Sequence, residues 1–249
     1  MRFNLKIFSS LATIAGIVLV MISCEKDYKN ESAPTPPTPP VASWTESFTD
    51  HAALGSKGWV IINNTDKPGP EAWRRGRFES TNKAIWNPEY VIGFPAYKME
   101  RSPNDFISVD MYAGAQVANM SVWLITPITK IKNGDELQFY TRAHLDTSSW
   151  QLKDGSDRMQ VRANYTNTST DVGSNWTTVG NFTTLMVDIN PGLVPHAYPQ
   201  GWTKYTLTVS GVTGTINGRF AFRYFVQNGG PDGLFSSVCG VDEVSFVSK

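Results

Sequence analysis

The stretch that decides the fold class reads Arg219-Phe220-Ala221-Phe222-Arg223-Tyr224-Phe225-Val226. Its even positions carry Phe, Phe, Tyr and Val, and its odd positions carry Arg219, Ala221, Arg223 and Phe225. Successive side chains of a β-strand point to opposite faces of the sheet. This period of two therefore predicts a β-strand with one face in an apolar core.

The same alternation recurs along most of the chain. Leu137, Phe139 and Thr141 share one face of residues 136–143, opposite Gln138, Tyr140 and Arg142, and the pattern repeats at residues 158–164 and 204–209. Further strands are predicted at residues 60–63, 106–111, 121–125, 176–179 and 241–247. Turn signals such as Asn217-Gly218 separate them, and no window shows a sustained helical period. The sequence predicts a single all-β domain over residues 43–249, built as a two-sheet β-sandwich.

The first 23 residues have the form of a secretory signal. Arg2 and Lys6 precede an uncharged apolar run at residues 7–22. The run ends at Ser23-Cys24, which resembles a bacterial lipobox, so Cys24 is the predicted lipidation site. A plain signal peptide or an N-terminal anchor helix is the alternative. The charged residues 25–27 resemble the export signal of Bacteroidetes surface lipoproteins, which implies a lipid anchor in the outer membrane at the cell surface.

Residues 24–42 form a predicted spacer between the lipidated cysteine and the domain. Its centre, residues 34–40, carries five prolines in seven positions, a composition that favours an extended polyproline II conformation. The spacer would hold the folded domain away from the lipid surface.

The composition excludes several functional classes. Lys plus Arg number 22 and Asp plus Glu number 22, so the formal net charge is zero, which argues against a nucleic-acid partner. The chain lacks the Gly-x-Ser-x-Gly, His-Glu-x-x-His, Walker and Cys-x-x-Cys motifs, so we expect no enzymatic activity. Cys239 follows a turn and begins a predicted strand, and we expect a buried structural cysteine there.

Short motifs in a consistent order resemble the cleaved-adhesin or "choice-of-anchor J" family. They are Glu46-Ser47-Phe48, Gly58-Trp59 and residues 121–127, 136–139, 157–162, 202–205, 219–224 and 241–246. The resemblance spans most of residues 44–247 and departs from the family pattern in an insert at residues 73–105. It implies a jelly-roll β-sandwich, similar to galactose-binding and MAM-like modules, with an adhesive or binding role rather than a catalytic one.

The resemblance also implies a structural calcium ion that ties the first strand to the last. Asp242 shares a predicted face with Val244 and Phe246, where a carboxylate must be paired, hydrogen-bonded or bound to a cation. Matching the motif positions gives Glu46 and Asp242 as calcium ligands, with Asp50 and Asp66 as possible additions. A bulge that turns Asp242 outward, or hydrogen bonds to loop amides, is the alternative.

Aromatic residues outside the family motifs are the candidate ligand-binding residues, because an exposed ring stacks on the apolar face of a sugar. They are Trp73, Trp86, Tyr90, Trp150 and Tyr198, and the alternative is that each ring covers an end of the sandwich.

Three functions remain open at this stage. The first is a non-catalytic surface lipoprotein that binds a glycan or a host-matrix protein. The second is a structural or assembly subunit that binds other surface proteins. The third is a glycoside hydrolase, which needs two acids across a cleft, with Asp146, Asp154 and Asp157 as the nearest candidates.

Overall fold

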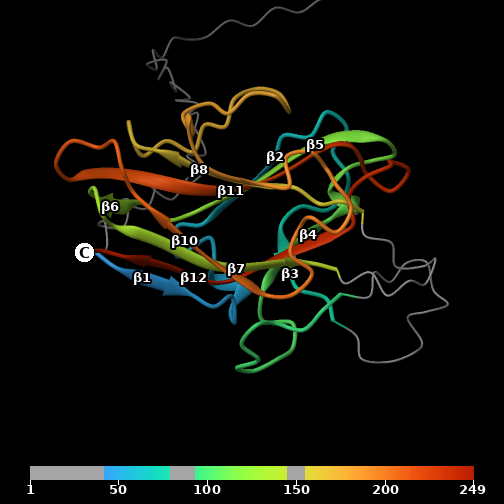
Figure 1. Ribbon diagram of the computed structural model, residues 1–249, viewed down its shortest axis with the longest axis horizontal. Helices are drawn as coiled ribbons and strands as arrows, with labels where there is room; N and C mark the ends of the chain where they lie inside the picture. Colours follow the sequence, from blue (N-terminus) through green and yellow to red (C-terminus); the bar gives the residue numbers. More distant parts are fainter. Residues whose placement is uncertain (1–41, 79–92, 145–154) are drawn as a thin grey trace, which may run out of the picture. The chain divides into compact units, whose positions relative to one another are not determined.

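Two antiparallel β-sheets form the two layers of the domain in the computed structural model, which describes residues 42–78, 93–144 and 155–249 (Figure 1). Cys24, Trp86, Tyr90 and Trp150 lie outside the described residues, as do the predicted signal segment and most of the spacer. Among the described residues, no helix is long and apolar enough to span a membrane.

The first sheet has the strand order β10-β7-β12-β4-β3, and β1 pairs with the far half of β12. Its strands are β1 (Trp44–Glu46), β3 (Arg74–Arg75), β4 (Ile107–Asp110), β7 (Glu136–Ala143), β10 (Thr203–Thr208) and β12 (Val238–Val247).

The second sheet has the order β2-β5-β11-β8-β9, and β6 pairs with the start of β11. Its strands are β2 (Val60–Asn63), β5 (Ala118–Ile125), β6 (Thr129–Ile131), β8 (Met159–Asn164), β9 (Thr184–Ile189) and β11 (Ile216–Gly229). Two 3₁₀ turns, His51–Ala53 and Met111–Ala113, complete the regular structure of the described residues.

The core lies between the two sheets and is built from the alternating apolar positions of their strands. Phe139 of the first sheet meets Phe222 of the second edge to face, with ring centroids 5.0 Å apart, and Phe246 meets Phe220 at 5.7 Å. Burial of such rings supplies most of the stabilisation of a sandwich. The expected all-β, two-sheet architecture is confirmed.

One predicted strand is wrong. Residues 176–179 contain no strand; they form a turn followed by irregular backbone within the segment 165–183, which runs over the outer face of the second sheet. Val172 and Phe182 of this segment pack on Trp123, Ile125 and Ala221 and form a small second apolar cluster. The segment is therefore held by packing and not by a strand ladder.

A bulge in β12 reverses the predicted face of Asp242. The register against β7 shifts between Asp242 and Ser245, and Glu243 adopts a φ of 48°. Asp242 pairs with Tyr140, whereas Val244 and Phe246 stay in the core. An added residue in one strand inverts the faces on its two sides, and this places the Asp242 carboxylate on the outer face of the first sheet.

Residues 93–106 cover one end of that outer face. Phe94, Phe106 and Val238 pack there against Trp202. Gly240 lies beneath the rings, and a Cβ at this position would come within 2.8 Å of Phe94 and 2.9 Å of Phe106. The absence of a side chain at Gly240 allows the covering segment to lie directly on β12.

Candidate functional site

Two stacked tyrosines, Tyr97 and Tyr140, form the candidate site on the outer face of the first sheet; we call them the tyrosine pair. Their ring centroids lie 3.8 Å apart with an interplanar angle of 17°, and the Tyr97 hydroxyl donates to the Tyr140 hydroxyl at 3.1 Å. Tyr140 points outward from β7, as its place opposite Phe139 and Thr141 requires. Tyr97 is the outer ring and is 43% exposed.

Asp242 fixes the backbone that carries Tyr97. Its Oδ2 accepts hydrogen bonds from the backbone N–H groups of Tyr97 at 2.9 Å and Lys98 at 3.4 Å, and its Oδ1 accepts from Glu243 N at 2.8 Å. The Trp202 indole N–H donates to Pro95 O at 2.9 Å and ties down the preceding residues. The tyrosine pair is thus held on a rigid base, which reduces the entropy that a ligand must overcome on binding.

Charged and polar groups surround the tyrosine pair. Lys98 Nζ lies 3.0 Å from Glu243 Oε2. Lys204 of β10 stands opposite Tyr140 of β7 in the strand register. The hydrogen bond to Tyr140 raises the pKa of Tyr97, so the phenol stays neutral near pH 7. Burial raises the pKa of Asp242 to about 7, against the backbone hydrogen bonds that lower it.

This arrangement is suited to binding a ligand that has an apolar face and polar edges. The open face of Tyr97 offers stacking area, and Lys98, Glu243 and Lys204 offer donors and acceptors beside it. Neither tyrosine is among the binding residues that the sequence predicts. A signal for Tyr140 was present, because it stands on the polar face of the 136–143 alternation.

Two of the predicted ligand-binding aromatics are core residues instead. Trp73 is 3% exposed and donates its indole N–H to Val122 O at 3.0 Å. Tyr198 is 1% exposed, and its hydroxyl lies 2.7 Å from Thr141 Oγ1. Rings buried in this way cannot stack on a glycan, so the binding role predicted for Trp73 and Tyr198 is wrong. Trp86, Tyr90 and Trp150 lie outside the described residues.

The four predicted calcium ligands are not brought together. Glu46 pairs with Lys57 at 2.9 Å, Asp50 caps a 3₁₀ turn through Ala53 N, Asp66 binds the backbone and side chain of Asn119, and Asp242 binds the amides described above. In the described parts of the chain, no group of three or more His, Cys, Asp or Glu residues is placed to hold a metal ion. The predicted ligand set is therefore wrong, and the outward bulge given as its alternative is what the structure contains.

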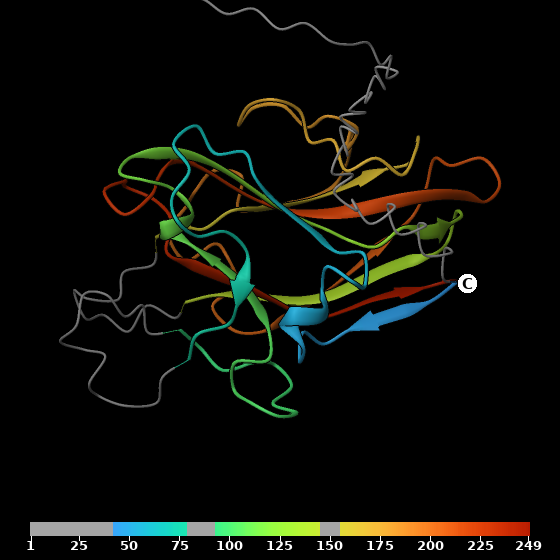
Figure 2. The same cartoon turned by 180° about the vertical axis from the view of Figure 1, so that it is seen from behind.

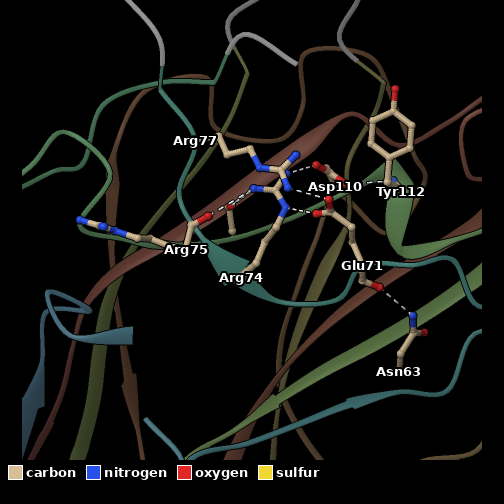
Figure 3. Close-up of polar contacts among 8 residues, drawn as sticks. Asn63, Glu71, Arg74, Arg75, Arg77, Asp110 and Tyr112 are labelled. Atoms are coloured by element: carbon tan, nitrogen blue, oxygen red, sulfur yellow. Dashed lines mark hydrogen bonds and ion pairs between the residues drawn. The ribbon is translucent and has the colours of Figure 1, made fainter. Parts of the chain in front are cut away.

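A partly buried ionic network joins residues 71–77, which include β3, to β4 at one corner of the sandwich (Figure 3). Arg74 lies between two acids, with Nη2 on Asp110 and Nε on Glu71, and Arg77 pairs with the other oxygen of Glu71 at 2.6 Å. Asp110 also accepts from Tyr112 N at 2.9 Å, and burial raises its pKa.

The network does not have the form of a glycosidase acid pair, because Arg74 occupies the space between the two carboxylates. Asp157, the described member of the acids predicted for hydrolysis, is fully buried and accepts hydrogen bonds from Tyr224 and Ser237. Asp146 and Asp154 lie outside the described residues. The geometry of the described acids therefore gives no support to hydrolysis.

Cys239 is fully buried on β12, and desolvation raises its pKa well above the ordinary value for a thiol. The prediction of a structural cysteine is confirmed.

A groove of about 260 Å³ runs between β9 and β10, the edge strands of the two sheets. Its lining residues are uncharged: Tyr165, Thr184, Leu185, Met186, Thr206, Leu207, Thr208 and Ser210. Burial raises the pKa of Tyr165 to about 12.

The fold and the site define an antiparallel β-sandwich domain with an outward-facing aromatic pair. Comparison with protein-family models and with curated proteins gives no match. Among solved structures, the K1 cleaved adhesin domain of Lys-gingipain from Porphyromonas gingivalis W83 is 17% identical, with a TM-score of 0.44, covering 84% of this chain and 99% of that one. The K3 domain of the same protein is 17% identical, with a TM-score of 0.46 and coverage of 83% and 98%.

The family 11 carbohydrate-binding module of a cellulosomal cellulase from Clostridium thermocellum is 11% identical, with a TM-score of 0.37, covering 84% of this chain and 96% of that one. At identities of 17% or less and TM-scores of 0.46 or less, these similarities assign neither a family nor a ligand to this chain.

Proposed function

We propose that this chain is a non-catalytic binding domain that binds a glycan at the tyrosine pair. The observation that carries the proposal is an exposed tyrosine ring, stacked at 3.8 Å on a second ring that the sheet holds in place. A sugar ring stacks on such a surface through its C–H face, while its hydroxyls bond to charged and polar neighbours. Lys98, Glu243 and Lys204 are the neighbours that would supply those bonds.

The proposal includes the location of the domain. The lipobox-like Ser23-Cys24 and the proline-rich spacer support a lipid anchor at Cys24. In this proposal the domain lies outside the outer membrane, where it can bind glycans of the medium. The spacer would make the binding site more accessible to large ligands, because an extended polyproline segment holds the domain away from the lipid headgroups of the membrane.

A protein partner is the second candidate function, and Met99 favours it. This side chain is 65% exposed two residues after Tyr97 in the chain, and a sugar does not need an exposed apolar side chain of this kind. Tyr and Met are both enriched at protein interfaces. A matrix protein or another surface subunit would bury both residues together.

The test is retention of the full-length protein on immobilised polysaccharides and matrix proteins. We expect retention on at least one glycan, a loss of at least tenfold in affinity for Tyr97→Ala, and near-normal binding for Tyr97→Phe, which keeps the stacking ring. Leu234→Ala, at a side chain that is 78% exposed elsewhere, is the matched control and should bind normally.

Equal binding by Tyr97→Ala and wild type would overturn the site. Binding to matrix protein alone, with a loss in Met99→Ala, would replace the glycan proposal with the protein one. Release of reducing sugar from any retained glycan would contradict the non-catalytic assignment.

A further inference from the structure

Three arginines gather on the outer face of the second sheet, on the opposite side of the domain from the tyrosine pair. They are Arg158, Arg162 and Arg223, which we call the arginine cluster. One carboxylate, Asp188 of β9, lies among them. The three guanidinium groups and one carboxylate give this region a formal charge of +2.

Arg223 is a buried cation without an acid of its own. It is 2% exposed, and its hydrogen bonds go to neutral acceptors: Ser121 Oγ at 2.9 Å, Gln160 Oε1 at 3.3 Å and the Trp176 carbonyl. Among the ion pairs of the described residues, none includes Arg223. Burial, together with the charges of Arg162 and Arg158, lowers its pKa to about 9. Burying an uncompensated charge is costly, which is why buried charges are normally paired.

Asp188 does not neutralise the cluster. Arg158 binds both of its oxygens, at 2.9 and 2.6 Å, and Gln160 Nε2 donates to it at 2.8 Å. This bidentate pair accounts for one of the three guanidinium groups. The charges of Arg162 and Arg223 remain.

Arg162 offers unused donors at the surface of the cluster. Its Nε donates to Phe182 O at 2.9 Å, and this is its one hydrogen bond within the described ranges. The Arg162 side chain is partly exposed, and its two terminal nitrogens make no hydrogen bond to the described residues. Half-buried aromatic rings, Trp176 and Phe225, lie nearby with centroids 6.0 Å apart, and Arg223 stacks on Phe225 at 3.8 Å.

We infer that the arginine cluster is a binding site for an oxyanion, the carboxylate or sulfate group of an acidic sugar. Guanidinium groups bind such groups through paired N–H donors, and the field of Arg223 beneath the site adds attraction without needing contact. Arg223 and Arg158 already stack on the Phe225 ring, so the partly exposed Trp176 ring beside it is the apolar surface for the sugar that carries the charge. This site uses none of the residues of the tyrosine pair, so either site can fail without the other.

The test is calorimetric titration of the full-length protein with glucuronate, glucose 6-sulfate, inorganic sulfate and glucose at constant ionic strength. We expect tighter binding of at least one of the anionic sugars than of glucose. Arg162→Gln should weaken that binding at least tenfold. Asp188→Asn should tighten it several-fold, because it removes the competing carboxylate.

Arg142→Gln is the matched control, since Arg142 is a half-buried arginine of the first sheet that bonds to Gln200 O and stacks on Phe94. It should leave anion binding unchanged. Glucuronate binding without sulfate binding assigns a carboxylate, and the reverse assigns a sulfate ester. Absence of binding by every anionic probe, equal binding of glucose, or equal effects of Arg162→Gln and Arg142→Gln would overturn the inference.

Discussion

The carboxylate of Asp242 accepts a hydrogen bond of 2.9 Å from the backbone N–H of Tyr97, a residue 145 positions earlier in the chain. The contact exists because the bulge in β12 turns Asp242 away from the core and towards the covering segment. The last strand of the fold therefore sets the position of the proposed binding surface.

The first prediction concerns the pH dependence of stability. The pKa of Asp242 is about 7 in the folded protein, against an ordinary value of 3.8. Because the folded state binds this proton more tightly than the unfolded state, its stabilising contribution is fully present below about pH 4 and is lost as the pH rises through about 7. In urea unfolding, we expect the free energy of unfolding of wild type to fall from pH 4 to 7 relative to that of Asp242→Asn.

Asp50→Asn, at an exposed cap, is the control. Its free energy of unfolding should change with pH in the same way as that of wild type between pH 4 and 7. An NMR titration of the Asp242 carboxyl with a midpoint near 4 would contradict the prediction directly.

The second prediction tests the contact between β12 and its covering segment. Gly240→Ala places a Cβ within 2.8 Å of Phe94, so residues 93–106 must move. We expect a loss of about 1–3 kcal/mol in the free energy of unfolding, as for other overpacked sites, together with weaker ligand binding at Tyr97. Gly55→Ala, where a Cβ meets nothing within 4 Å, should change neither. Wild-type stability in Gly240→Ala would show that the segment does not lie on β12.

The third prediction concerns the ionic network. Arg74→Gln leaves the buried Asp110 carboxylate without its cation, and breaking a buried pair from one side typically costs about 3–5 kcal/mol. Arg77→Gln removes a half-exposed partner of Glu71 and should cost about 1 kcal/mol or less. Chemical unfolding of both variants at pH 7 measures the difference. Similar losses in the free energy of unfolding of the two variants would show that Arg74 does not contribute more to stability than Arg77.

The fourth prediction concerns calcium, which stays untested as a bound ion. Each of the four predicted ligands already has its own hydrogen-bond partners, so we expect the calorimetric melting temperature of the full chain to be the same in calcium and in EDTA. A ligand that binds only the folded state raises its stability. A clear fall in melting temperature on chelation would therefore place a calcium ion in the protein.

The fifth prediction concerns the anchor. Cys24→Ser removes the proposed lipid attachment point, so the protein should lose incorporated fatty acid and leave the membrane fraction. Cys239→Ser is the control for loss of a thiol as such, because Cys239 is buried in the core. Continued membrane association of Cys24→Ser would favour the anchor-helix alternative.

The sequence was sufficient to predict the sandwich because each strand buries one face. Apolar and polar residues therefore alternate along the strand with a period of two. Residues 136–143 show this directly, since their buried and half-buried positions alternate in the structure as their apolar and polar residues do in the sequence. The failures come from contacts made across the fold. Trp73 stands in a polar stretch, yet its indole reaches the Val122 carbonyl, 49 positions away.

The face of Asp242 illustrates a second limit. Strict alternation with Val244 and Phe246 predicts that the Asp242 side chain lies in the core. A single bulge in β12 places it on the outer face instead. The position of Tyr97 has the same origin, since the segment that carries it contains no strand and is fixed by Asp242, Trp202 and Phe106. Local patterns predict elements, whereas the site depends on how distant elements meet.

The pairing of β1 with β12 has a mechanical consequence. Trp44 lies opposite Phe246, and Ser248 N bonds to Ser43 Oγ, so the first described strand runs beside the last at one edge (Figure 2). β1 is three residues long, so a pull on the proposed lipid tether at Cys24 would reach Trp44 before the longer strands. Under a pull directed away from the sheet, the bonds between β1 and β12 would open one at a time. The proposed tether would then lengthen by one short strand before the load reached the rest of the first sheet.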